Sequence, residues 1–368
     1  MPKVSVIVPI YRAKQFLVPC VSSLKRQGLS DLEILLVDDC SPDDTYEYAL
    51  EHFGSDENVR VIRQAENGGP GRARNRGIEE AKGEYICFCD VDDVYIDGAV
   101  SYMLQETERL GADVYSSSEL YITVADPLPD DLSTLKEENL IKTGYITNEQ
   151  ALHEGSCELA GSIEERTKLW LEHHYHWNVF GKLYRTDFLR RERIRFSDVK
   201  LGEDHLFILN VFLKAGVYAS QVKALYIYRT GNVNTISRGS RSEALFLNAM
   251  KSVFSLSDVI DETVAGIPFF DEHPEYVWRL KYMHIRELEE GYAVAKYHAV
   301  GREVLSRNRE VTDLFTEYFG KKGAYVEKIL YDAYDGRAAG PSIEEVTTYE
   351  NMKKIKDSLQ TGFFSMFS

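Results

Sequence analysis

Three carboxylates follow directly after an apolar segment in the stretch GEYICFCDVDD, which spans residues 83–93. They are Asp90, Asp92 and Asp93, and like charges placed so close together repel one another. Hard cations such as Mg²⁺ and Mn²⁺ bind carboxylate oxygens together with phosphate oxygens, and such a cation would offset the repulsion. The alternative is that the acids lie at the start of a helix, where negative charge is favourable.

Two reactions use an Asp-x-Asp pair such as Asp90 and Asp92. In one class of phosphatase the first aspartate attacks a phosphate and the second acts as acid and base. In nucleotide-sugar enzymes the pair holds a metal ion on a diphosphate. The phosphatase nucleophile normally follows the first strand, whereas this pair follows the fourth apolar segment and the first segment ends in VPIY. The position therefore favours the nucleotide-sugar enzymes.

The elements that must position these acids alternate along the first half of the chain. Apolar segments alternate with segments of helical spacing, which predicts a parallel sheet covered on both faces. We expect strands at 4–9, 32–38, 59–62, 85–89 and 113–117, and helices at 14–26, 42–53, 72–81 and 99–110. Ligands bind at the carboxyl ends of such strands. Because Tyr11, Asp38 and Asp39 follow the first two strands, we expect them at the same edge as Asp90 and Asp92.

The pattern changes in the second half of the chain. Residues 124–148 contain two prolines and many acids, and we expect a solvated loop there. GEDHLFILNVFLKAG predicts a buried helix that begins at Glu203 and Asp204, and VKALYIYR predicts a strand. Helical spacing then recurs over 243–264 and 275–320. The sequence therefore predicts an α/β fold followed by a helical C-terminal region.

Composition excludes several classes of protein. The 368 residues carry a net charge of −16, with 28% charged and 44% hydrophobic residues, which is typical of a soluble globular protein and does not suggest a nucleic-acid partner. No stretch approaches the roughly 20 apolar residues that span a bilayer, and the start MPKVSVIVPIY lacks a signal-peptide cleavage site. The five scattered cysteines favour a reducing compartment, so we expect a cytoplasmic protein, with peripheral contact on the membrane face left open.

Four motifs in order resemble the inverting glycosyltransferases of family 2, which have the GT-A fold. They are VSVIVPIYRAKQFLVPCVSSLKRQ, EILLVDDCSPDDT, NGGPGRARNRGIEEAKGEYICFCDVDD and GEDHLF, within about the first 240 residues. The resemblance implies a GT-A-type nucleotide-binding fold with a mixed, mostly parallel central sheet. It implies a nucleotide-sugar-binding half over 1–110 and an acceptor-binding half over 111–238, and the helical region, 239–368, lies outside it.

The resemblance also implies roles for single residues. Pro9 and Tyr11 would line the nucleobase pocket, where Tyr11 offers a stacking face. Asp38 or Asp39 would accept hydrogen bonds from the base, which is typically uracil in this family. The alternative role for Asp38, Asp39, Asp43 and Asp44 is to cap the following helix, and we keep this alternative for Asp43 and Asp44.

A second group of residues could contact the nucleotide. Asn67, the glycines Gly68, Gly69 and Gly71, and Arg74 form a loop that leads into a helix, where glycine lets the backbone approach a ligand and a basic side chain could meet a nucleotide. The alternative is that Arg72, Arg74 and Arg76 only offset nearby acids. Asp90 would lie near the ribose or the metal ion. Asp92 would bind Mn²⁺ or Mg²⁺ on the diphosphate.

The acceptor side would supply the base. Asp204 matches the family's base position and Glu203 is the second choice, and the alternative is an acid that only begins a helix. HHYHW, residues 173–177, either adds a histidine to the metal site or forms a surface or core cluster, and its tryptophan could stack on an acceptor sugar. Residues 226–238 either form a lid that reaches the diphosphate through Arg229 or Arg238, or mark a plain strand-to-loop boundary.

Together these features predict a metal-dependent inverting glycosyltransferase. It would move a hexose or N-acetylhexosamine from a UDP-sugar to a hydroxyl of a glycan or lipid-linked glycan in surface-polysaccharide synthesis. The Asp-x-Asp phosphatase and a non-catalytic glycan-binding scaffold are the alternatives. The last residues, MKKIKDSLQTGFFSMFS, are either a frayed tail or a weak contact with a membrane or partner, and the C-terminal helices could join two copies of the chain.

Overall fold

The computed structural model describes residues 1–123, 140–144, 157–159, 161–172, 177–199, 201–230 and 242–288, with a few positions between 304 and 314. The chain divides into two compact units: Met1–Asp198 with Phe207–Asn232, and Val199–Leu206 with Val233–Ser368. The predicted division into 1–110, 111–238 and 239–368 stays a prediction. Residues 199–206 group with the C-terminal helices, and the backbone N–H of Leu201 donates to Ser252 Oγ at 3.2 Å.

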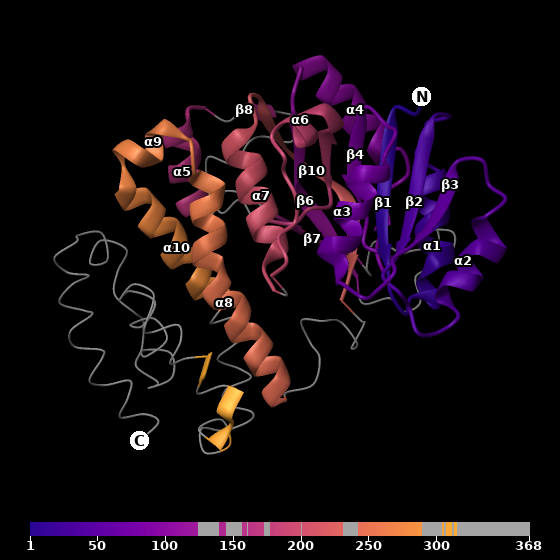
Figure 1. Ribbon diagram of the computed structural model, residues 1–368. Helices are drawn as coiled ribbons and strands as arrows, with labels where there is room; N and C mark the ends of the chain where they lie inside the picture. The colour runs from indigo at the N-terminus through magenta and orange to yellow at the C-terminus, as the bar shows by residue number, and fades with distance from the viewer. Residues whose placement is uncertain are drawn as a thin grey trace. The chain divides into compact units, whose positions relative to one another are not determined.

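Within the described residues, the first unit contains a ten-stranded mixed sheet in the order β3-β2-β1-β4-β9-β6-β10-β5, with β7 beside β6 and β8 beside β10 (Figure 1). The strands are β1 (Val4–Ile10), β2 (Leu32–Asp38), β3 (Val59–Arg63), β4 (Tyr85–Phe88), β5 (Val94–Tyr95), β6 (Val114–Thr123), β7 (Ile141–Gly144), β8 (Cys157–Leu159), β9 (Lys182–Arg185) and β10 (Tyr218–Arg229). β3, β2, β1 and β4 are parallel neighbours. Beyond β4 the pairings are antiparallel, except for β6 with β10. The predicted mixed α/β fold is confirmed.

The helices of this unit are α1 (Leu17–Lys25), α2 (Thr45–Phe53), α3 (Pro70–Glu80), α4 (Ala99–Leu110), α5 (Ile163–Leu171), α6 (Thr186–Arg191) and most of α7 (Glu203–Lys214). The first three begin at other residues than predicted, α4 has the predicted bounds, α7 begins at the predicted Glu203, and α5 and α6 were not predicted. Lys14–Phe16 forms a 3₁₀ turn before α1 instead of its first turn. α2 begins three residues later than predicted, because residues 42–44 form a turn in which Asp43 Oδ1 accepts from the Thr45 N–H at 3.3 Å.

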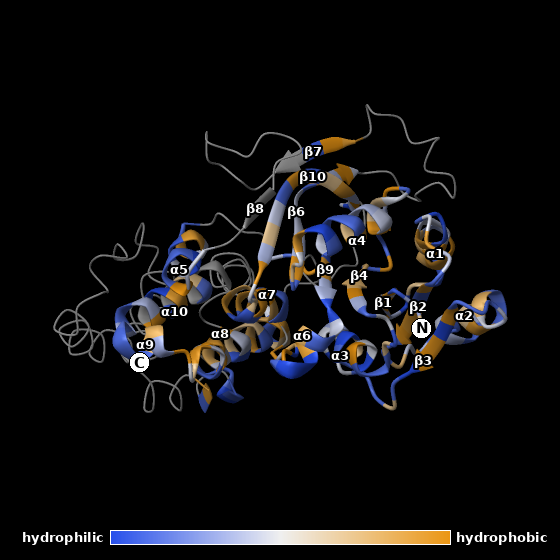
Figure 2. Cartoon of the chain, turned by 90° about the horizontal axis from the view of Figure 1, so that it is seen from above, coloured by the Kyte–Doolittle hydropathy of each residue, from blue (hydrophilic) through white to orange (hydrophobic). Residues whose placement is uncertain are grey.

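Apolar side chains alternate between the two faces of the parallel strands, as expected for a sheet buried on both sides. On one face Val6 packs in a core cluster that also contains Val21 of α1 and Met103 of α4. On the other face α3 lies close to β1, and a Cβ atom at Gly77 would stand 2.3 Å from Ile7 Cγ2. Figure 2 shows β2 and β4 in the orange of hydrophobic residues.

The second unit is helical in the part that the structure describes. It contains α8 (Glu243–Val264), α9 (Pro268–Glu272) and α10 (Pro274–Leu288), together with the first residues of α7. The predicted helix 243–264 is confirmed, and its start is capped by Ser242, whose Oγ accepts from the Leu245 N–H. The predicted helix 275–320 is present as α10, and its remainder lies largely outside the described residues. None of the described helices is both long and apolar enough to cross a membrane.

Candidate functional site

The Asp90–Asp93 segment connects β4 to β5 at the carboxyl end of β4. The side chains of Asp90 and Asp92 are 27% and 22% exposed, whereas Asp93 is 1% exposed. The next helix, α4, begins only at Ala99, so the alternative that these acids open a helix is wrong. Two partly exposed carboxylates and one buried carboxylate therefore form the cluster.

Asp93 is held by the end of β10. Its Oδ2 accepts from the Tyr226 hydroxyl at 2.9 Å, and its Oδ1 accepts from the Arg229 backbone N–H at 2.8 Å. Burial, followed by repulsion from Asp92 and Asp90, raises the pKa of Asp93 well above its ordinary value, against these two hydrogen bonds. Sequence reasoning assigned Asp93 no separate role and missed Tyr226.

Two buried arginines reduce the repulsion within the cluster. Arg74 is 3% exposed, and its Nη2 donates to Asp90 Oδ1 at 2.8 Å. Arg229 is 1% exposed, its Nε donates to the backbone oxygen of Asp92 at 3.1 Å, and its Nη2 lies 3.9 Å from Asp92 Oδ2. The protein itself therefore supplies positive charge to the acids, in addition to any cation. Because Arg229 is buried at the end of β10, it does not lie on a lid there.

At the carboxyl end of β2, Asp38 is completely buried. Its Oδ2 accepts from the Ser41 N–H at 3.0 Å and lies 3.5 Å from Arg63 Nε. Its Oδ1 is buried and has no hydrogen-bond partner among the described residues. A buried carboxylate oxygen in this condition is unfavourable, and a ligand N–H would relieve it.

Asp39 fixes the loop that precedes α3. Its Oδ1 accepts from Gln64 Nε2 at 2.6 Å and from the Gly68 N–H at 2.8 Å, and its Oδ2 accepts from Asn67 Nδ2 at 2.9 Å and from the Gly69 N–H at 2.7 Å. The carboxylate thus ties the loop to the end of β2. Asn67, which was predicted to contact a nucleotide, acts in this structure as a partner of Asp39.

The end of β1 lies between these two groups, because β1 pairs with both β2 and β4. Pro9 is buried within the strand, while the Tyr11 side chain is 44% exposed. Arg12 and Cys40, just beyond β1 and β2, have φ angles of 51° and 57°, in the left-handed region that L-residues rarely adopt. Backbone strain of this kind gathers at functional sites.

Glu203 and Asp204 begin α7, as predicted, within the residues that group with the C-terminal helices. The neighbouring His205 ring lies 5.9 Å from the ring of His284 on α10, centre to centre. The second unit therefore holds the segment that carries the predicted base. Three predicted histidines, His173, His174 and His176, lie outside the described residues, as does Arg238, while Trp177 is 39% exposed.

The donor atoms at the end of β4 fit a hard divalent cation, because the carboxylate oxygens of Asp90 and Asp92 are the ligands that Mg²⁺ and Mn²⁺ prefer. Over the described part of the chain, no group of three or more His, Cys, Asp or Glu residues is arranged to hold a metal ion. A cation would therefore need further oxygen ligands, for example from a phosphate. Mg²⁺ is commonly bound in this way, by one or two carboxylates together with phosphate oxygens.

Known proteins resemble this chain in sequence and in structure. Residues 5–146 match the family described as "Glycosyl transferase family 2". The chain is 34% identical over 243 residues to the uncharacterized glycosyltransferase EpsJ of Bacillus subtilis. The aligned region covers 64% of this chain and 63% of EpsJ, so the chain spans less than two thirds of that relative. Two crystal structures of S. aureus TarS 1–349, in complex with UDP and with UDP-GlcNAc, superpose with TM-scores of 0.58 and 0.55 at 18% identity. Each covers 98% of this chain and 92% of TarS 1–349.

The sheet, the acidic residues at its edge and these likenesses define a GT-A-type α/β domain. In sequence, the first part of the chain, residues 5–146, is similar to glycosyltransferase family 2.

Proposed function

We propose that this protein is a metal-dependent inverting glycosyltransferase that uses a UDP-sugar. The observation that carries the proposal is the arrangement at one edge of the sheet. There Asp38, whose Oδ1 has no hydrogen-bond partner in the described part of the chain, follows β2, and the partly exposed carboxylates of Asp90 and Asp92 follow β4, two strands away. The end with Asp38 suits a neutral N–H donor, and the end with Asp90 and Asp92 suits a diphosphate with its cation.

The nucleotide half of the donor would bind beside β1 and β2. The exposed Tyr11 ring offers a face on which a base can stack. Asp38 Oδ1 would accept a hydrogen bond from an N–H of the base, which uracil can supply. The complexes of TarS with UDP and UDP-GlcNAc support a uridine nucleotide, since that protein shares the fold.

Asp90 and Asp92 would hold Mn²⁺ or Mg²⁺ together with the diphosphate. When bound, such a cation neutralises the charge that develops on the departing nucleoside diphosphate. The chain's own contribution is to keep both carboxylates in place, through Arg74 on Asp90 and Arg229 on Asp92.

Transfer with inversion needs a base on the acceptor side of the sugar. The acceptor oxygen would bond to the sugar C1 as the bond from C1 to the diphosphate oxygen breaks, and the hydroxyl proton would pass to Asp204. Glu203 is the second candidate for this role. Both begin α7, where a carboxylate is stabilised by the helix dipole.

The acceptor and the cellular location are further parts of the proposal. A glycan or lipid-linked glycan of a surface polysaccharide is the acceptor class that the similarity to family 2 suggests. A cytoplasmic location is supported by the scattered cysteines, of which Cys20, Cys40, Cys87 and Cys89 are free thiols. The phosphatase alternative requires a nucleophile after the first strand, where this chain has Tyr11.

A panel of nucleotide sugars, incubated with Mn²⁺ or with EDTA, tests the proposal by the release of free nucleotide. We expect one or a few UDP-sugars to be hydrolysed with Mn²⁺ and not with EDTA, and hydrolysis needs no acceptor. Asp92→Asn should abolish the release. Failure of every nucleotide sugar to bind would contradict the proposal, and glycan binding without turnover would favour the scaffold.

A further inference from the structure

One hydroxyl contacts both ends of the Asp90–Asp93 turn. The backbone N–H of Asp90 donates to Tyr226 Oη at 3.0 Å, and that hydroxyl donates to Asp93 Oδ2 at 2.9 Å. Tyr226 belongs to β10, which is remote in sequence but pairs with β5 directly after the turn, Tyr226 opposite Tyr95. The turn is therefore joined to β10 by the sheet and by a side chain.

Arg229 adds two more bonds from the same strand. Its backbone N–H donates to Asp93 Oδ1 at 2.8 Å, and its Nε donates to the backbone oxygen of Asp92 at 3.1 Å. The Arg229 guanidinium also lies 4.0 Å from the centre of the Phe16 ring, a cation–π contact that fixes its direction. These bonds fix the backbone of the two residues whose carboxylates are partly exposed, Asp90 and Asp92.

The position of the Tyr226 hydroxyl is itself determined by packing. Its ring is buried, stacks on Phe180 with centres 4.3 Å apart and planes 10° apart, and meets the edge of Tyr95 at 4.9 Å. Neighbouring rings on two sides leave the side chain little freedom. The hydroxyl is therefore a fixed point against which the turn is set.

A buried acid beside two other acids is unfavourable unless it is bonded, and over the described residues both hydrogen bonds to the Asp93 carboxylate come from β10. The residues that these bonds position are those with the exposed carboxylates. The arrangement matches the way in which outer groups orient the ligands of a metal site, where loss of one group commonly weakens metal binding by about 10- to 100-fold.

We infer that Asp93 is the anchor of the metal-binding turn, and that Tyr226 and Arg229 are positioning residues that set the separation of Asp90 and Asp92 for a divalent cation and a diphosphate. This inference rests on the proposed function. It assigns the third carboxylate to the interior of the protein and not to the cation.

Tyr226→Phe in the full chain tests the inference, because it keeps the stacked ring and removes only the hydroxyl. The readouts are Mn²⁺ affinity in the presence of UDP, from electron paramagnetic resonance, UDP affinity in EDTA, from calorimetry, and the thermal midpoint. We expect Mn²⁺ affinity to fall by about tenfold or more, with UDP affinity in EDTA unchanged. A merely structural hydroxyl would move the thermal midpoint alone.

Tyr184→Phe is the matched control. Tyr184 is also completely buried, and its hydroxyl donates to the Val179 backbone oxygen at 2.8 Å, so the same atom and a bond of similar length are lost. Arg229→Lys is the second variant, which keeps the charge and the backbone N–H but removes the Nε donor to Asp92; it decides the question if Tyr226→Phe does not fold.

Wild-type Mn²⁺ affinity in Tyr226→Phe, or an equal loss in Tyr184→Phe, overturns the inference while the proposed function stands. If the wild-type protein binds neither UDP nor a nucleotide sugar with Mn²⁺, the proposed function itself fails, and the inference fails with it.

Discussion

Arg74 Nη2 lies 2.8 Å from Asp90 Oδ1, and the two side chains differ greatly in exposure, at 4% for Arg74 and 27% for Asp90. The Arg74 guanidinium also lies over the Phe196 ring, 5.3 Å from its centre, in a cation–π contact. A buried charge thus holds a carboxylate at the protein surface. The crowded acids after β4 are tolerable before any cation binds.

Arg74→Leu should therefore weaken both the fold and the binding of a nucleotide. Loss of a hydrogen bond to a charged group costs about 2 kcal/mol of unfolding free energy. We expect that loss in urea unfolding, together with a weaker Mn²⁺-dependent affinity for UDP. Arg72→Leu is the control, because Arg72 lies on the same helix in an exposed pair with Glu66, and such a change commonly costs less than about 0.5 kcal/mol. Equal effects of the two variants would contradict the role of Arg74.

Asp39→Asn should destabilise the loop before α3. The four donors around the carboxylate all need an acceptor, and the new amide group would face two of them. We expect a loss of about 2–4 kcal/mol in unfolding free energy, since each unsatisfied buried group costs roughly 1–3 kcal/mol. Asp43→Asn is the control, because Asp43 is exposed and asparagine makes an equivalent turn. Wild-type stability of Asp39→Asn would show that the loop does not depend on the charge.

The first half of the fold could be predicted because burial determines it. Continuous apolar runs such as 32–38 specify parallel strands, and β2 has the predicted bounds. Helix starts were less predictable, since α2 begins at Thr45, whose N–H donates to Asp43 of the preceding turn. These local bonds compete with the first helical turn and leave little trace in the pattern of apolar residues.

The candidate site was only partly predictable. Asp38, Asp90 and Asp92 could be found because polar residues after buried strands are unusual. Tyr226 and the anchoring role of Asp93 could not, because the contact joins segments 133 residues apart. The one available signal was YIYR, an arginine that closes an apolar strand. Arg229 supports the acids because it is buried beside them, and its charge alone does not indicate that position in the sequence.

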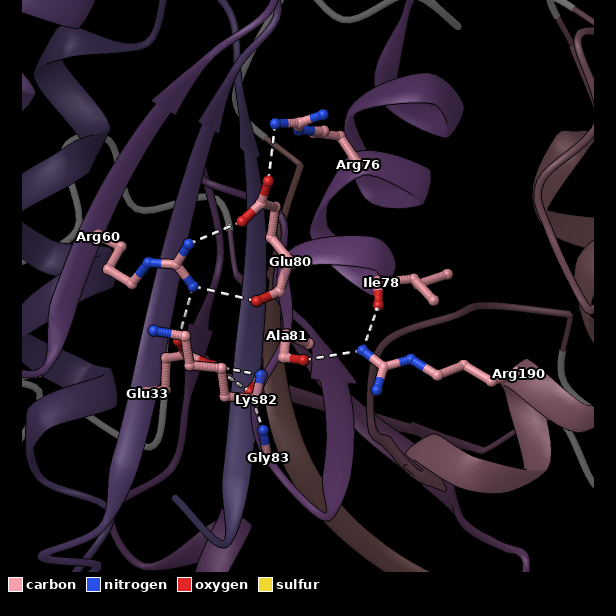
Figure 3. A network of polar contacts seen from close by, with 10 residues as sticks. Glu33, Arg60, Arg76, Ile78, Glu80, Ala81, Lys82, Gly83 and Arg190 are labelled. Carbon is pink, nitrogen blue, oxygen red and sulfur yellow. Dashed lines mark hydrogen bonds and ion pairs between the residues drawn. The ribbon is translucent and has the colours of Figure 1, made fainter. Parts of the chain in front are cut away.

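Acid should destabilise the first unit through Glu33, at the opposite end of the sheet from the site. Burial raises the pKa of Glu33, but hydrogen bonds from Ser5 Oγ at 2.5 Å, the Lys82 N–H at 2.9 Å and Arg60 at 2.9 Å outweigh it and leave the pKa below its ordinary 4.5. Figure 3 shows Arg60 and Lys82 beside Glu33. A lowered folded-state pKa contributes stability that is complete above the unfolded-state pKa, and this stability is lost as pH falls through the folded-state value.

Glu33→Gln should remove that contribution. At neutral pH we expect a loss of about 1–3 kcal/mol in unfolding free energy, because an amide group then faces the donors of the carboxylate. The difference from wild type should shrink as pH falls below 4.5, where the wild-type carboxylate becomes protonated. Urea unfolding across this pH range measures it, and Glu66→Gln, on an exposed side chain, is the control. A difference that stays constant with pH would rule out the titration of Glu33 as its cause.

Asp204→Asn should separate turnover from donor binding. If Asp204 takes the acceptor's proton, the variant loses the base and keeps its shape, so transfer should fall by about 10²- to 10⁴-fold. UDP-sugar affinity should stay unchanged, because the nucleotide would bind beside β1, β2 and β4. Glu203→Gln is the matched control on the preceding residue of α7. Calorimetry and a transfer assay on the same preparations measure both quantities. Full transfer in Asp204→Asn with loss in Glu203→Gln would move the base by one residue, and full transfer in both would place it elsewhere.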